Sequence, residues 1–123
     1  MKIKFVYKIL PVLVLYTDNL DPKWGGYCYG PFIKIRNKYK DDIGLLEHEL
    51  THSKQVYRTI FLHGLFYKFS ETYRVKSEVE AYKVQASYYS DTMGSYNWMS
   101  DVILEKYNIS KYNKQQVLDL LSK

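Results

Sequence analysis

The sequence predicts an α+β domain in which the strands come before the helices. Residues 2–8 alternate apolar and charged side chains, and residues 9–16 form a β-branched, apolar run. After residue 42 the apolar residues recur at helical spacing. The chain of 123 residues has the size of one compact unit, so we expect a single domain over residues 1–123.

The first 36 residues predict the strands. In residues 2–8, Ile3, Phe5 and Tyr7 lie on one side and the lysines on the other, which predicts a half-buried strand. Residues 9–16 predict a second or continued strand, and 18–26 form a loop rich in Asn, Asp, Pro and Gly. Residues 27–36 predict another strand, which Pro31 restricts to a sheet edge because proline cannot donate to the ladder.

The rest of the chain predicts helices. Asp41 or Asp42 can cap a helix that runs to about Phe61 and ends near residues 63–64, with 65–69 as a short aromatic connection. Ser70 can cap a second helix that reaches about Ser90. Residues 91–97 break the pattern, and 98–107 and 113–121 predict two shorter helices.

Charge and targeting features exclude several classes of protein. The net charge is +5, but the lysines are spread along the chain without a nucleic-acid-binding motif, so we expect no nucleic-acid partner. The apolar run near the N-terminus is interrupted by Lys8 and Pro11 and is too short to span a bilayer. We therefore expect no membrane partner and a cytoplasmic location. Cys28 is alone, which excludes an internal disulfide and a cysteine zinc cluster, and we interpret it as a strand residue.

The segment His48-Glu49-Leu50-Thr51-His52 is an HExxH motif on the first predicted helix. Residues four apart on a helix lie about 40° apart around its axis, so both imidazoles can bind one metal ion. Glu49 lies beside them, where it can accept a proton from a water molecule that zinc has acidified. On the opposite side of the helix, the sequence predicts an apolar stripe against the sheet, formed by Ile43, Leu46, Leu50, Tyr57 and Phe61.

A catalytic zinc site usually has a third protein ligand, and the second helix supplies the best candidate. Glu78 lies within about 60° of the centre of that helix's apolar stripe, whereas Glu80 points about 140° away and is expected to be a solvated charge. A carboxylate on a buried stripe needs a metal or a charged partner, and the alternative partner is Arg74. His63 would lie about 16 Å beyond His52 on a continuous helix, so we expect a helix-end role unless the chain folds back sharply.

An HExxH helix followed by a glutamate helix resembles the gluzincin branch of the zincin metallopeptidases. Glu78-Val79-Glu80-Ala81 is similar to the ExxA pattern of small bacterial and phage-encoded members, and the resemblance covers roughly residues 27–90. Tyr82 stands where the family usually has an aspartate that orients a histidine ligand, which leaves the support of that histidine open.

The resemblance implies a small zincin-like domain whose edge strand packs on the HExxH helix and whose His48, His52 and Glu78 hold Zn²⁺. It also implies a peptide or protein substrate, with Glu49 as general base and with substrate held by β-augmentation on the edge strand around residues 29–35. Arg74, His63 or a tyrosine is expected to stabilise the oxyanion. The alternative is a zinc-binding structural or interaction module without turnover, against which the intact Glu49 argues.

Overall fold

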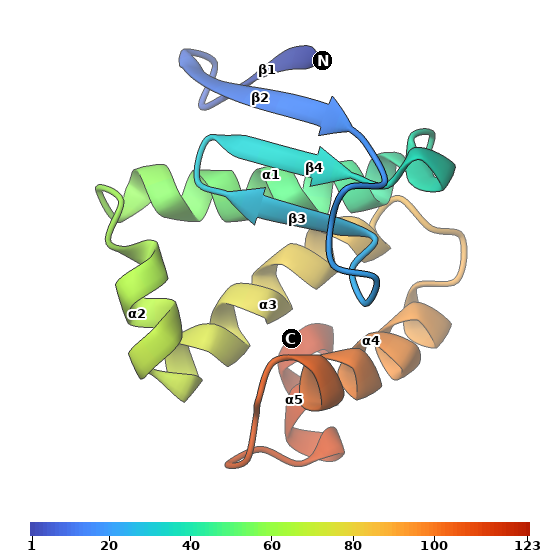
Figure 1. Cartoon of the computed structure of the whole chain (residues 1–123). Coiled ribbons are helices and arrows are strands. Elements are labelled where there is room, and N and C mark those ends of the chain that lie inside the picture. Colours follow the sequence, from blue (N-terminus) through green and yellow to red (C-terminus); the bar gives the residue numbers. More distant parts are fainter.

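The computed structural model describes all 123 residues and confirms the predicted α+β class (Figure 1). Its one sheet has the strand order β1-β2-β4-β3, in which β2 and β4 are parallel and the other neighbours are antiparallel. The strands are β1 (Lys2–Val6), β2 (Leu10–Tyr16), β3 (Gly26–Tyr29) and β4 (Phe32–Ile35).

Five α-helices follow the sheet, after a short 3-10 turn at Asn37–Tyr39. Four of them begin at a side-chain cap, because Asp42, Ser70, Asp91 and Asn113 each accept a backbone N–H from the first turn. The caps expected at Asp42 and Ser70 are thereby confirmed. The helices are α1 (Ile43–Arg58), α2 (His63–Phe69), α3 (Glu71–Ala86), α4 (Thr92–Lys106) and α5 (Lys114–Ser122).

The single strand expected over residues 27–36 is two strands. Gly30 has a φ of 67° and starts a sharp turn with Pro31, which reverses the chain into a hairpin. As a result β3 is one edge of the sheet, with β1 at the other, while β4 is paired on both sides, with β2 and with β3. The expectation that residues 32–35 belong to an edge strand was therefore wrong, and of residues 26–35 only β3, Gly26–Tyr29, lies at an edge.

The helix boundaries differ from the prediction in several places, and α3 ends at Ala86, short of the expected Ser90. α1 ends at Arg58, because Ile60 and Phe61 adopt left-handed φ values of 55° and 64° that reverse the chain. His63 then opens α2, so the predicted aromatic connection is a helix. Similarly, the break predicted at 91–97 is shorter, because the Asp91 cap starts α4 at Thr92.

One face of the sheet packs on α1, and the other face is open (Figure 1). The inner face carries the buried side chains, and in β1 only Val6 is buried, at 2% exposure. Ile3 and Phe5, expected on the buried side of this strand, are each 60% exposed. The core between the sheet and α1 consists of Val6, Val12, Val14, Ile33, Ile35 and Leu50.

The second core joins α3, α4 and α5, so α1 lies between the sheet and α3 and is covered on two sides. Gly44 allows α1 and α3 to approach closely, since a Cβ there would come within 3.0 Å of the Gln85 carbonyl oxygen. The apolar stripe predicted on α1 is confirmed only in part: Leu50 is buried, but Ile43 is 59% exposed and Phe61 lies beyond the helix. No helix in the structure combines the length and apolarity that a bilayer crossing requires.

The two isoleucines Ile43 and Ile103 test this division between surface and core. Ile103 is fully buried in the helical core, so Ile103→Ala is expected to reduce the free energy of unfolding by about 2–5 kcal/mol. Ile43→Ala removes the same atoms from an exposed position and should change it by less than about 0.5 kcal/mol. Urea unfolding of both variants measures the difference, and equal losses would contradict the packing described here.

Candidate metal centre

The structure brings His48, His52 and Glu78 together between α1 and α3. The Nε2 atoms of the two histidines are 3.2 Å apart, and Glu78 Oε1 lies 3.5 Å from that of His48 and 3.2 Å from that of His52. All three side chains are buried, and one ligand atom from each lies within 4.8 Å of the others. The three residues could therefore hold a metal ion.

The electrostatics of this cluster favour a cation. Burial alone would raise the pKa of Glu78, but His52 and His48 hold it well below its ordinary value, so the carboxylate stays ionised. Burial alone would lower the pKa of His52, yet Glu78 outweighs it and raises the pKa to about 9. A buried carboxylate that favours positive charge on the facing imidazoles also favours a metal ion between them.

Gln55 fixes the orientation of His52. The amide nitrogen of Gln55 donates to the Ser77 carbonyl at 3.1 Å and to Glu80 at 2.7 Å, so its oxygen is left to accept. That oxygen lies 2.8 Å from His52 Nδ1, which must therefore carry a proton. A metal ion that displaced the second proton, on Nε2, would meet the lone pair of that atom at the centre. Glu80, expected to be a solvated charge, is half-buried and binds Gln55 and Arg58, with Arg58 at 2.9 Å.

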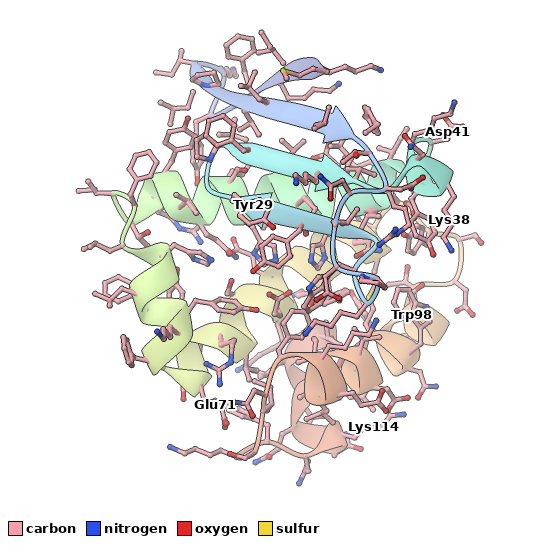
Figure 2. The ribbon with its side chains drawn as sticks, in the orientation of Figure 1. Tyr29, Lys38, Asp41, Glu71, Trp98 and Lys114 are labelled. Atoms are coloured by element: carbon pink, nitrogen blue, oxygen red, sulfur yellow. The ribbon has the colours of Figure 1, made fainter.

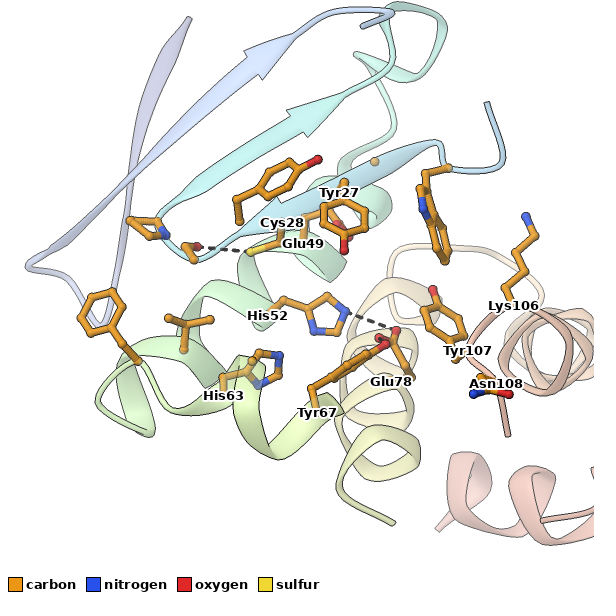
Figure 3. Close-up of a pocket in the computed structure, with 18 residues that line it drawn as sticks. Tyr27, Cys28, Glu49, His52, His63, Tyr67, Glu78, Lys106, Tyr107 and Asn108 are labelled. Carbon is orange, nitrogen blue, oxygen red and sulfur yellow. Dashed lines mark hydrogen bonds and ion pairs between the residues drawn. The ribbon is translucent and has the colours of Figure 1, made fainter. Parts of the chain in front are cut away.

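Glu78 has its own support from α2. The hydroxyl of Tyr67 donates to Glu78 Oε2 at 2.6 Å, whereas the histidines face the other carboxylate oxygen, Oε1; Figure 3 shows Tyr67 beside Glu78. Burial and the nearby Glu78 raise the pKa of Tyr67, which keeps the phenol protonated. The alternative partner of Glu78, Arg74, does not contact it. Arg74 instead donates to main-chain carbonyls of Tyr67 and Tyr107, both at 2.7 Å, and so ties α2 and the end of α4 to α3.

Glu49 lies beside the cluster without belonging to it. Its Oε1 is 3.8 Å from His48 Nε2, and its Oε2 is buried without a hydrogen-bond partner. Burial raises the pKa of Glu49, so this carboxylate accepts a proton more readily than an exposed one. Gly26 of β3 allows the close approach of the edge strand, since a Cβ there would lie 3.3 Å from Glu49 Cγ.

The support of His48 differs from that of His52. Its ring packs edge-on against Tyr82, with centroids 4.3 Å apart, and its Nδ1 is buried without a partner. Tyr82 occupies the place of the expected aspartate and uses its hydroxyl on Tyr107 at 2.9 Å. The side-chain oxygen of the nearby Gln85 is also buried without a hydrogen-bond partner. His48 and Gln85 both line a second cavity, of about 520 Å³, which also borders Glu49.

The cluster opens into a cleft of about 690 Å³ that runs beneath β3 (Figure 3). Tyr27 and Tyr29 of the edge strand form one wall, and Figure 2 shows Tyr29 on this strand. Glu49, His52 and Glu78 lie in the floor, so a molecule in the cleft passes the candidate metal ligands. The remaining walls come mainly from α1, from α2 and from the end of α4, with Val56, Phe61, His63, Tyr67, Lys106 and Tyr107.

His63 is in the cleft because the chain does fold back after α1. Its ring centroid is 6.1 Å from that of His52, and its Nδ1 lies 2.7 Å from the Tyr73 hydroxyl. Burial and the neighbouring His52 lower the pKa of His63 to about 4, so the ring is neutral at pH 7. The role expected for it at a helix C-terminus was wrong, because it begins α2.

Cys28 takes no part in this chemistry. It lies in β3 as expected, with its Sγ 3.2 Å from the Gly30 carbonyl and 3.3 Å from Ser53 Oγ. Burial raises the pKa of the thiol to about 12, so the nucleophilic thiolate does not form at neutral pH.

Sequence reasoning missed Gln55, Tyr67 and the position of His63. Gln55 was detectable, because it lies one helical turn after His52 on the same face. The positions of Tyr67 and His63 depend on the chain reversal at residues 60–61, where the sequence has no glycine or asparagine that would predict a turn.

The chain matches no protein-family model, no curated protein and no solved structure.

The contact between Gln55 and His52 can be tested through metal affinity. Gln55→Leu keeps the side-chain size but removes the acceptor for the imidazole N–H, so we expect zinc to bind about 10–100-fold more weakly. Competition with a chromophoric chelator measures the affinity. Gln115→Leu, on the exposed side of α5, is the matched control and should bind zinc like the wild type. Unchanged affinity in Gln55→Leu would show that His52 does not need this support.

Proposed function

We propose that the protein is a zinc-dependent peptidase of the HExxH-plus-glutamate type. The proposal is carried by the spacing of the three candidate ligand atoms. Two ligand atoms on a tetrahedral zinc ion, each about 2.0–2.1 Å from it, lie about 3.3 Å apart. The three separations here are 3.2, 3.2 and 3.5 Å. Two imidazoles and one carboxylate are also a donor set that catalytic zinc sites use, whereas Mg²⁺ and Ca²⁺ prefer oxygen ligands. Zinc binding would displace the second proton of His52.

A bound zinc ion would lower the pKa of a water ligand to about 7 and would polarise a carbonyl group. Glu49 lies beside the ligands with one free carboxylate oxygen and a raised pKa, so it can take the proton of the attacking water. The protonated Glu49 then returns this proton to the amine that leaves. These positions favour a hydrolase over a structural metal site, because a structural site gains nothing from a buried general base beside its ligands.

The substrate we propose is an extended peptide that pairs with β3. This strand is the edge of the sheet that borders the cleft, so a peptide can add to it through main-chain hydrogen bonds. The peptide would then pass over Glu49, which Gly26 brings close to the strand. The cleft of about 690 Å³ has room for several residues of such a peptide.

Glu49 and Glu78 should separate turnover from metal binding. Glu49→Gln keeps the shape of the side chain but cannot accept the proton, so it should bind about one zinc per chain and lose about 10²–10⁴-fold in peptide hydrolysis. Glu78→Ala should lose the metal and with it the activity. Elemental analysis and cleavage of a peptide library measure the two effects, with Glu105→Gln on the surface of α4 as the control. Hydrolysis by Glu49→Gln at the wild-type rate would rule out the peptidase mechanism.

We further propose that His63 donates a hydrogen bond to the substrate carbonyl oxygen as negative charge develops there. It is neutral at pH 7 and lies in the wall of the cleft beside His52. Arg74 does not line the cleft, and its guanidinium is held by main-chain carbonyls.

His63→Phe should therefore retain zinc but reduce kcat by about 10²–10³-fold with a smaller change in KM. Steady-state kinetics and metal content, measured on the same preparation, test this role. Loss of the metal, or an unchanged kcat, would assign His63 a structural role instead.

A further inference from the structure

One end of the molecule combines exposed apolar side chains with positive charge. This end, called here the apolar basic end, consists of the β1–β2 turn, the turn after α1 and the outer side of α2, which lie on the same side of the molecule at the left of Figure 1. The hydroxyl of Tyr57 donates to the Pro11 carbonyl at 2.7 Å and so joins α1 to β2 at this end. Its exposed apolar residues are Phe5, Tyr7, Ile9, Ile60, Phe61, Leu62, Leu65, Phe66 and Phe69.

Two features show that this exposure is unusual. Ile60 and Phe69 are 82% and 74% exposed, and the apolar residues occur together at one end, which marks an interaction surface on a folded domain. The backbone is also held in the left-handed region at both turns, at Tyr7 and Lys8 and again at Ile60 and Phe61. Bulky and β-branched residues rarely adopt this conformation, and here it places them at the tips of the turns.

The charge distribution indicates what this end can bind. Residues 1–17 and 53–70 together contain six Lys and Arg residues and no Asp or Glu, whereas the rest of the chain has twelve basic and thirteen acidic residues. These two segments therefore carry +6 and the rest of the chain −1. Lys8 and Lys68 lie at the apolar basic end itself, in the β1–β2 turn and in α2, whereas Lys2 lies at the far end of β1, beside Tyr16. The lysines are spread along the whole chain, whereas the acidic residues are absent from these two segments. One of the six cations, Arg58, is paired with Glu80, at 2.9 Å.

We propose that the apolar basic end docks on an anionic membrane surface. Exposed Phe, Ile and Leu side chains can enter the boundary between head groups and acyl chains, while the lysines lie among negatively charged lipid head groups. A second copy of the chain fits less well, because a symmetric pairing of this end would bring like charges together.

This docking departs from the expectation of no membrane partner, which rested on the lack of a spanning segment. It does not depend on the proposed peptidase activity. Phe61 and His63 contribute both to this end and to the wall of the cleft, so docking would place the cleft mouth at the lipid surface.

Co-sedimentation of the full chain with lipid vesicles tests the proposal. We expect the protein to bind vesicles of equimolar phosphatidylcholine and phosphatidylserine, to bind pure phosphatidylcholine much more weakly, and to dissociate as salt is raised. The double variant Ile60→Ser/Phe69→Ser should reduce partitioning by about tenfold or more. The matched control, Tyr88→Ser/Met93→Ser, removes two exposed apolar side chains from another part of the surface and should bind normally.

A second pair of variants tests the charge. Lys8→Gln/Lys68→Gln should weaken binding to the anionic vesicles, whereas Lys38→Gln/Lys40→Gln should have less effect, since Figure 2 shows Lys38 at the opposite end. No binding to anionic vesicles, or equal losses in variant and control, would overturn the proposal. So would a dimer, seen by sedimentation velocity without lipid, that Ile60→Ser/Phe69→Ser abolishes. Circular dichroism establishes that each variant is folded.

Discussion

The structure depends on one buried carboxylate, that of Glu78, held between two imidazoles in the interior of a small domain. Removing a carboxylate from water is costly unless positive charge and hydrogen-bond donors replace the solvent. His48 and His52 meet this requirement from α1, and the Tyr67 hydroxyl meets it from α2. These contacts require α1 and α3 to cross closely, which Gly44 permits. The helix packing and the candidate metal centre are therefore two aspects of the same arrangement.

The same requirement explains the polar residues that surround the centre. Gln55 accepts the hydrogen bond of the His52 imidazole and donates in turn to the Ser77 carbonyl and to Glu80. The face of α1 toward α3 is therefore polar, and the face toward the sheet is apolar. Arg74 donates hydrogen bonds to the main-chain carbonyls of Tyr107, at the end of α4, and of Tyr67 in α2. The second bond keeps Tyr67 against Glu78. The short helix α2 thus belongs to the centre, although no predicted ligand lies in it. His48 lacks equivalent support, since Tyr82 offers it only a ring edge.

The local parts of this arrangement could be predicted from the sequence, and the non-local parts could not. Helical phase alone placed His48 and His52 on one face and chose Glu78 over Glu80, because residues on one helix share a fixed geometry. The hairpin at Gly30 and the reversal at Ile60 and Phe61 depend on left-handed residues, and in the second case no glycine or asparagine indicates the turn. These two turns make β3 an edge strand beside the cleft and bring His63 into the cleft. The exposed apolar side of β1 was also misjudged, since alternation gives two faces and does not say which one is covered.

The two hydrophobic cores have a consequence for the domain as a whole. The sheet and α1 form one core, and α3, α4 and α5 form the other, with a polar layer in between. His48 and His52 belong to the first unit and Glu78 to the second. An ion shared by these residues would act as a further cross-link between the two halves, in addition to contacts such as that between the Trp24 and Tyr107 rings, whose centroids are 5.3 Å apart. Loss of the ion would remove this cross-link, while each half would keep its own apolar packing.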